Sequence, residues 1–191
     1  MDPIEIIAVV FGIASVWLST REHIGSWPTA LVNVALYFVI LQRANLYANA
    51  WLQLVYFALS CYGWYEWKFG GSAHTGVVVT RTSRRAAGIL VALVLAGTVS
   101  LAWGLMRFTD ASSPWLDAAT TAVSCAAQWM MTRKLLENWM VWSAVNVVYV
   151  GLYLSQGLLL TSALYVVYFG LAVSGYFAWK KSLESRGERP R

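Results

Sequence analysis

Charged residues are scarce in this sequence. They make up 12% of the 191 residues, whereas hydrophobic residues make up 59%, and a typical soluble domain carries about 25% charged residues. Long apolar stretches recur along the whole length, with only short polar gaps between them. This pattern excludes a water-soluble domain and predicts a polytopic membrane protein. The net charge of +5 does not indicate nucleic-acid binding, because the basic residues flank apolar runs, as they do in membrane proteins.

The sequence also lacks carboxylates in the middle of its apolar runs. All nine Asp and Glu residues lie in a gap, in a tail or near the end of a run. Ionisable residues inside a membrane commonly mark ion pathways and proton relays. Their absence argues against a mechanism that is coupled to a proton or Na⁺ gradient.

Residues for other intramembrane chemistry are equally sparse. His23 and His74 fall in gaps, and Cys61 and Cys125 lie within apolar runs without the spacing of a metal or redox site. Neither H-E-x-x-H nor G-x-S-x-G occurs, so an enzyme is not expected. The lysines stand at or beyond the ends of runs, which argues against a retinal-binding protein, and no histidine is placed to ligate haem. No metal or other cofactor is therefore expected.

Seven apolar runs approach the roughly 20 residues that a helix needs to cross a bilayer. They are Pro3–Thr20, Trp27–Gln42, Asn49–Trp67, Ala86–Met106, Pro114–Thr132, Trp139–Ser155 and Thr161–Trp179. With seven spans the gaps alternate between two sides, and only Arg43 and Arg107 of the 14 basic residues fall on one of them. The positive-inside rule predicts that the amino terminus is outside and the carboxy terminus is cytoplasmic. The charged tail from Lys180 to Arg191 is expected to be disordered.

The chain repeats itself at one fixed offset. Trp17 corresponds to Trp129. The difference between these two residue numbers, here called the repeat offset, also relates further pairs of identical residues, with no insertion or deletion between them. These are Thr20 and Thr132, Arg21 and Arg133, Trp27 and Trp139, Tyr37 and Tyr149, Leu52 and Leu164, Val55–Phe57 and Val167–Phe169, Gly63 and Gly175, and Trp67–Lys68 and Trp179–Lys180. So many matches at one offset indicate an internal duplication.

The repeat offset maps the first three spans onto the last three and leaves the fourth as a connector. Because an even number of spans separates equivalent positions, both triplets cross the membrane in the same direction. The predicted fold is an all-α membrane protein with seven transmembrane helices, in which two parallel three-helix repeats are joined by a linker helix. Its segments are the first repeat (1–68), a cytoplasmic loop and linker helix (69–113), the second repeat (114–181) and a charged cytoplasmic tail (182–191). Parallel repeats are a known transporter plan, and a duplicated, non-transporting scaffold is the alternative.

Polar and aromatic residues recur at steps of three and four in several predicted helices, which places them on one face of each helix. The stripes are Asn33 and Tyr37; Asn49, Gln53, Tyr56 and Ser60; Thr121, Ser124 and Gln128; and Trp139, Trp142, Asn146, Tyr149 and Tyr153. Such residues usually face the interior of a membrane bundle, and hydrogen bonding between helices is the alternative for the amides. The residues expected to be interfacial anchors, because they stand at span ends, are Trp27, Trp67, Trp139 and Trp179.

Several motifs are spread over nearly the whole chain. They are Trp27-Pro28, Leu46–Asn49 leading into Leu52–Tyr56, Tyr62–Trp67, and Glu137–Trp142 followed by Asn146 and Tyr149. In these motifs the chain resembles the PnuC family of bacterial vitamin transporters, and its 3+1+3 plan resembles the SWEET sugar transporters. The resemblance implies a homotrimer in the bacterial inner membrane that carries nicotinamide riboside by facilitated diffusion, with a cytoplasmic kinase trapping the substrate. Thiamine or riboflavin, the substrates of close relatives, is the alternative.

The candidate substrate-binding residues come from the stripes, these motifs and the repeat pairs. They are Trp142, Asn146, Tyr149, Gln128, Asn33, Tyr37, Gln53, Tyr56 and Tyr168. Amides supply the donors and acceptors that a carboxamide and ribose hydroxyls require, and aromatic faces attract a flat cationic pyridinium ring. We expect Trp142 to stack on the ring and Asn146 to hydrogen-bond its polar edge. A thiazolium would be bound about as well, so the chemistry leaves thiamine open.

Overall fold

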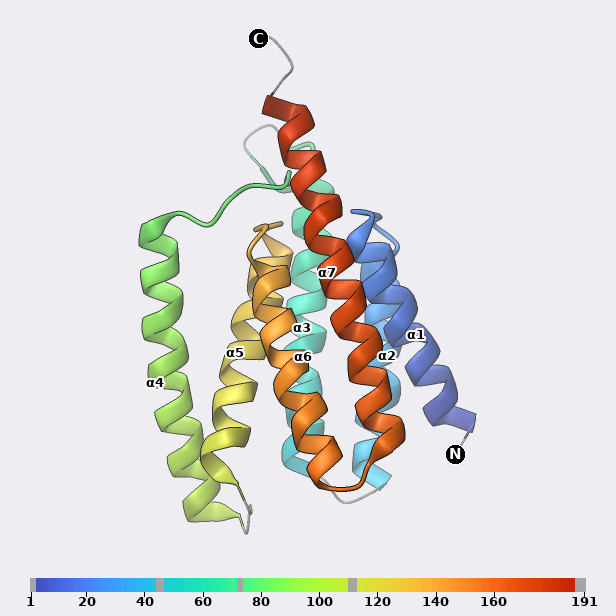
Figure 1. Cartoon of the computed structure of the whole chain (residues 1–191), viewed down its shortest axis with the longest axis vertical. Coiled ribbons are helices and arrows are strands. Elements are labelled where there is room, and N and C mark those ends of the chain that lie inside the picture. Colours follow the sequence, from blue (N-terminus) through green and yellow to red (C-terminus); the bar gives the residue numbers. More distant parts are fainter. Residues whose placement is uncertain (1–2, 44–46, 72–73, 110–112, 188–191) are drawn as a thin grey trace.

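The computed structural model describes residues 3–43, 47–71, 74–109 and 113–187. These residues form seven α-helices, one for each predicted span (Figure 1). The helices are α1 (Pro3–Thr20), α2 (Ser26–Arg43), α3 (Tyr47–Phe69), α4 (Arg84–Phe108), α5 (Pro114–Thr132), α6 (Asn138–Ser155) and α7 (Leu159–Gly187). The predicted all-α, seven-helix fold is confirmed.

Local sequence explains where the helices begin and end. Ser83 precedes α4, and its hydroxyl accepts a hydrogen bond from the backbone N–H of Ala86, an ordinary amino-terminal cap. Pro114 opens α5, where its missing N–H costs nothing. Gly157, with φ of 73°, follows α6 and turns the chain toward α7.

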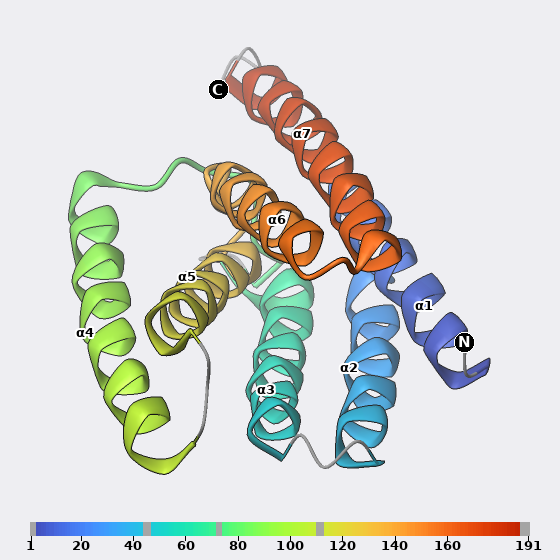
Figure 2. The same cartoon turned by 60° about the horizontal axis from the view of Figure 1, so that its bottom comes forward.

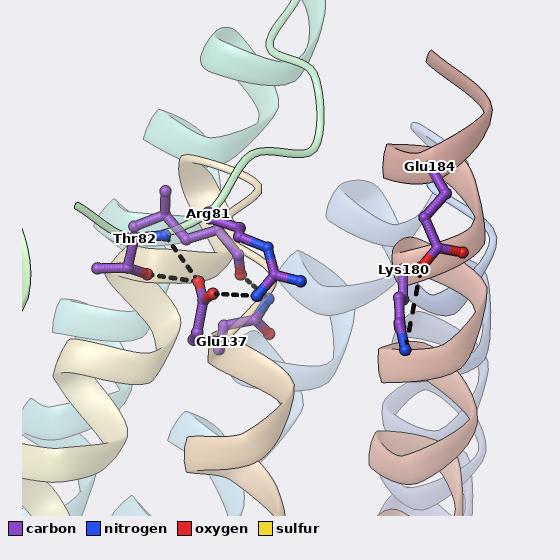
Figure 3. Close-up of polar contacts among 7 residues, drawn as sticks. Arg81, Thr82, Glu137, Lys180 and Glu184 are labelled. Carbon is purple, nitrogen blue, oxygen red and sulfur yellow. Dashed lines mark hydrogen bonds and ion pairs between the residues drawn. The ribbon is translucent and has the colours of Figure 1, made fainter. Parts of the chain in front are cut away.

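The prediction of a disordered tail is wrong for residues 180–187, which continue α7. Trp179 is fully buried, and Leu183, one turn later, packs against the same apolar cluster. Lys180 and Glu184 also pair along the helix at 3.9 Å (Figure 3). Packing against the cluster therefore extends the helix past the end of the apolar run. The charged composition of the tail did not indicate this packing. Residues 188–191 lie outside the described part of the chain.

Six of the helices pack into a closed ring in the order α1, α2, α3, α5, α6, α7, while α4 lies outside the ring against α5 (Figures 1 and 2). The repeats meet where α3 packs on α5 and where α7 packs on α1. These two junctions are equivalent under the repeat offset. Both α1 and α5 run upward in Figure 1, so the repeats are parallel. A connector between two parallel triplets is the arrangement that the duplication predicts.

The outer surface of the bundle suits a lipid environment. Leu93, Leu95 and Trp103 of α4 are each more than 60% exposed, which would be costly in water. Three helices of the described chain are long and apolar enough to cross a bilayer on length and composition: α1, α4 and the Leu159–Ser185 part of α7. The helices α2, α3, α5 and α6 are less apolar because they carry many of the polar side chains that face the centre of the ring. The chain is a multi-pass membrane protein.

Candidate functional site

A cavity of about 530 Å³ lies inside the ring, and all six ring helices contribute to its wall. This volume is within the usual range for small-molecule sites, roughly 300–1,000 Å³. All nine candidate residues line it: Asn33, Tyr37, Gln53, Tyr56, Gln128, Trp142, Asn146, Tyr149 and Tyr168. The structure thus brings together residues that the sequence placed on separate helices, and contact of any one of them with a ligand stays a prediction.

A second cavity, about 620 Å³, lies outside the ring between α4 and α5. Its wall is almost wholly apolar, with residues such as Ile89, Leu93 and Ala122. Binding sites need a few placed polar groups to orient a ligand, and this cavity offers hardly any. We therefore assign the functional site to the central cavity.

The amide side chains of the central cavity differ in whether they already form hydrogen bonds within the protein. The Nδ2 of Asn33 donates a hydrogen bond to the carbonyl oxygen of Ala8 at 2.7 Å, joining α2 to α1. The interhelical alternative therefore holds for the nitrogen of Asn33, and its oxygen, which has no hydrogen-bond partner among the described residues, can accept from a ligand. Asn146 is 5% exposed and also lines the cavity. It is the better candidate for a ligand that must be bound through both a donor and an acceptor.

Tyrosines from α6 and α7 form a continuous aromatic wall. The ring of Tyr165 lies 4.8 Å from that of Tyr149 and 5.3 Å from that of Tyr153, and Tyr168 follows at 5.9 Å, centroid to centroid. Stacked or tilted rings at these separations attract each other. They line the cavity together with the amides, and such aromatic side chains suit a planar ring.

Several residues of the cavity lining were not among the predicted candidates. Tyr165 lines the cavity although no stripe contained it, but it is the repeat equivalent of Gln53, and the repeat offset would have selected it. Ser15 and Ser19 of α1 also line the cavity, and serines in an apolar helix carry little signal. Thr121, a predicted stripe member, does not belong to the described lining. The side chain of Asn49 lies outside the described residues.

The four tryptophans predicted as interfacial anchors are instead buried inside the ring. Trp27, Trp67, Trp139 and Trp179 are each at most 7% exposed and form a tryptophan cluster at one end of the cavity. Within each repeat two rings meet edge to face, at 5.2 Å for Trp27–Trp67 and 5.3 Å for Trp139–Trp179. The anchor prediction is wrong because a position at the end of a span does not say whether the side chain faces lipid or a neighbouring helix.

Glycines make room for this cluster at equivalent positions. A Cβ added to Gly63 would collide with the ring of Trp27, and one added to Gly175 would lie 2.6 Å from Cε2 of Trp139. The two glycines are related by the repeat offset, as are the two tryptophans. Both repeats thus use the same device, a glycine under an indole ring, to close one end of the ring of helices.

Comparison with known proteins agrees with this architecture. The model of the nicotinamide mononucleotide transporter family matches residues 2–181. This chain belongs to that family. Among its relatives, the nicotinamide riboside transporter PnuC of Escherichia coli is 27% identical over 97% of this chain and 88% of its own length. The riboflavin/roseoflavin transporter RibM of Streptomyces davaonensis is 28% identical over 92% of this chain and 83% of its own length.

A solved structure of the family supports the assignment. The crystal structure of the vitamin B3 transporter PnuC matches with a TM-score of 0.75 and 28% identity, covering 94% of this chain and 81% of that one. The resemblance to the PnuC family drawn from the motifs is thereby confirmed. Family membership makes the chain a membrane transporter, and nothing in these comparisons favours the scaffold alternative.

Proposed function

We propose that this chain carries nicotinamide riboside across the bacterial inner membrane by facilitated diffusion, with a cytoplasmic kinase trapping the substrate. The observation that carries the proposal is the central cavity, whose lining combines amides with aromatic rings. Nicotinamide riboside combines a flat cationic ring with a carboxamide and ribose hydroxyls. Aromatic faces attract the ring, and amides hydrogen-bond the polar groups.

Relatives support this substrate over the alternatives. The relatives from Escherichia coli and Neisseria mucosa are named nicotinamide riboside transporters, and RibM is named a riboflavin transporter. Riboflavin has a wide neutral ring system that the tyrosine wall would also accommodate, so it is the second candidate. No Asp, Glu, Lys or Arg stands among the described lining residues. That lining supports facilitated diffusion, because an ion-coupled carrier usually holds an ionisable group on its pathway.

Proteoliposomes containing the purified chain should take up nicotinamide riboside until the inside and outside concentrations are equal, without any ion gradient. Uptake of thiamine and of riboflavin, measured in the same vesicles, should be slower. Protein-free liposomes serve as the control for leakage. Accumulation above equilibrium when a proton or Na⁺ gradient is applied would refute facilitated diffusion. Faster riboflavin uptake would instead assign the chain to RibM-like transport, and no saturable uptake of any of the three would revive the scaffold alternative.

The proposed orientation places the tryptophan cluster at the cytoplasmic end of the ring. Arg81, Arg133, Lys134 and Lys180 all lie in the loops or helix ends beyond that cluster, and basic residues prefer the cytoplasmic side. Reporter proteins fused after Arg191 or inserted near His74 should both report the cytoplasm. A periplasmic signal from either fusion would reverse the orientation. The homotrimer is likewise a proposal that rests on the resemblance, and native mass spectrometry of the purified protein would test it.

A further inference from the structure

Two residues at equivalent positions of the repeats pair with each other. Glu22 follows α1 and Lys134, its equivalent under the repeat offset, follows α5, and both adopt left-handed backbone conformations with φ of 54° and 48°. The Lys134 Nζ lies 2.9 Å from the Glu22 Oε2, and the two side chains are 9% and 18% exposed. When equivalent residues of a two-fold repeat touch, they must lie next to the axis that relates the repeats. This ion pair therefore crosses the pseudo-two-fold axis of the ring.

The same end of the ring holds other contacts from one repeat to the other. The Trp67 indole N–H donates to the carbonyl oxygen of Met131 at 3.1 Å, and the Trp179 indole N–H donates to that of Ser19 at 2.9 Å. These two hydrogen bonds are equivalent under the offset. The Lys134 ammonium also lies 4.4 Å from the ring centroid of Trp67, in cation–π geometry. The ion pair thus joins the two halves of the tryptophan cluster.

A segment of the linker covers this arrangement from outside. Val79 is buried in the tryptophan cluster, and Thr80 exchanges backbone hydrogen bonds with Lys134 and Leu136. The backbone N–H and hydroxyl of Thr82 both donate to Glu137 Oε2, at 2.8 and 2.7 Å (Figure 3). These contacts hold the turn that carries Lys134. The same segment is also joined to the first repeat, because the backbone N–H of Val77 donates to the carbonyl oxygen of Glu66 at 3.2 Å.

We propose that the Glu22–Lys134 pair is the latch of a gate at the tryptophan end of the cavity. Alternating access in parallel-repeat carriers moves one repeat against the other, so contacts across the axis must break when this end opens. The latch holds the tryptophan cluster closed while the cavity faces the other side, and it separates when substrate leaves past Trp27 and Trp139. Both tryptophans line the cavity, and their indole N–H groups are buried without a partner among the described residues, so opening this end would free them to donate to a passing substrate.

The test measures access to the cavity and requires no substrate. Ser15, which lines the cavity one turn deeper than Ser19, is replaced by cysteine in a background with Cys61→Ser and Cys125→Ala. A membrane-impermeant maleimide is then applied from each face of the membrane, using right-side-out and inverted vesicles. The latch rests on the proposed transport function. If nicotinamide riboside is not the substrate, this labelling is unaffected, so failure of the substrate assignment can be distinguished from failure of the latch.

Removing both charges with Glu22→Gln and Lys134→Met should raise the labelling rate from the face that carries the pair by about fivefold or more, the low end of usual conformational coupling. Exchanging the charges with Glu22→Lys and Lys134→Glu should restore the parent rate. By the two-fold relation, the lysine placed at position 22 would then lie over Trp179. The control is Lys180→Met with Glu184→Gln, which removes an exposed pair within α7 and should leave labelling unchanged.

Parent-like labelling in the folded, neutralised variant would overturn the latch. If the neutralised variant does not fold, Glu22→Gln alone decides, because it breaks the ion pair and leaves the cation over Trp67. Accelerated labelling of this variant supports the latch, and parent-like labelling overturns it.

Discussion

Replacing Asn146 with alanine should weaken binding of nicotinamide riboside by about tenfold or more. The side chain is 5% exposed and lines the cavity, so its loss would leave polar groups of the bound substrate without a partner. An unmet hydrogen bond in a desolvated site costs about 1–3 kcal/mol, and about 1.4 kcal/mol corresponds to tenfold in affinity. Titration calorimetry on purified protein would measure the change.

Trp142→Ala should weaken binding as well, because a stacked cationic ring would lose an attraction of about 1–2 kcal/mol. The matched control is Val147→Ala, which is on the same helix beside Asn146 but is 57% exposed on the outer surface. Its affinity should equal that of the parent. Each variant is first checked for parent-like elution on size exclusion. Unchanged affinity in both Asn146→Ala and Trp142→Ala would remove this stripe from the binding site and direct attention to Asn33 and Gln53.

Gly63→Ala and Gly175→Ala should each destabilise the protein, and by similar amounts. A methyl group at either position meets the face of a buried indole ring, of Trp27 or of Trp139 respectively. Both rings are at most 2% exposed and pack edge to face against Trp67 or Trp179, so neither ring can shift without disturbing the tryptophan cluster. Overpacking of this kind costs about 1–3 kcal/mol. The midpoint of heat-induced loss of monodisperse protein in detergent should fall in both variants.

Gly170→Ala is the matched control for the glycine experiment. Gly170 lies on α7, as Gly175 does, but an added Cβ would meet nothing within 4 Å. Alanine is favoured over glycine in a helix by up to about 1 kcal/mol, so this variant should keep or raise the melting midpoint. A parent-like midpoint in Gly63→Ala or Gly175→Ala would show that the cluster is looser than the structure indicates.

Much of the site follows from periodicity along the chain. A helix places residues three and four apart on one face, so the stripe from Trp142 to Tyr149 already identified the side of α6 that faces the cavity. The repeat offset likewise predicted the architecture. Two duplicated helix triplets on either side of a single connecting helix can be arranged in only a few ways. The nine candidate residues line one cavity because polar groups in a membrane are driven away from lipid.

The tryptophan cluster could not be read from the sequence. A tryptophan at the end of a span can face the lipid interface or a neighbouring helix, and the choice depends on what the neighbour offers. Here Gly63 and Gly175 offer space for an indole ring. Leu183 extends α7 beyond the apolar run for a related reason, since the cluster provides a surface for it to pack on. In both cases the partner is distant in sequence.

The sequence alone determined which helices exist, which face of each is polar and that the chain is built from two parallel copies of one unit. These properties depend on the spacing of residues along a single segment or on a constant offset. The tertiary structure alone decided that the six helices close into a ring, that Asn33 is partly committed to Ala8, and that Glu22 meets Lys134. Those outcomes depend on which side chains approach each other across the ring, and such distances are set only when all the helices pack together.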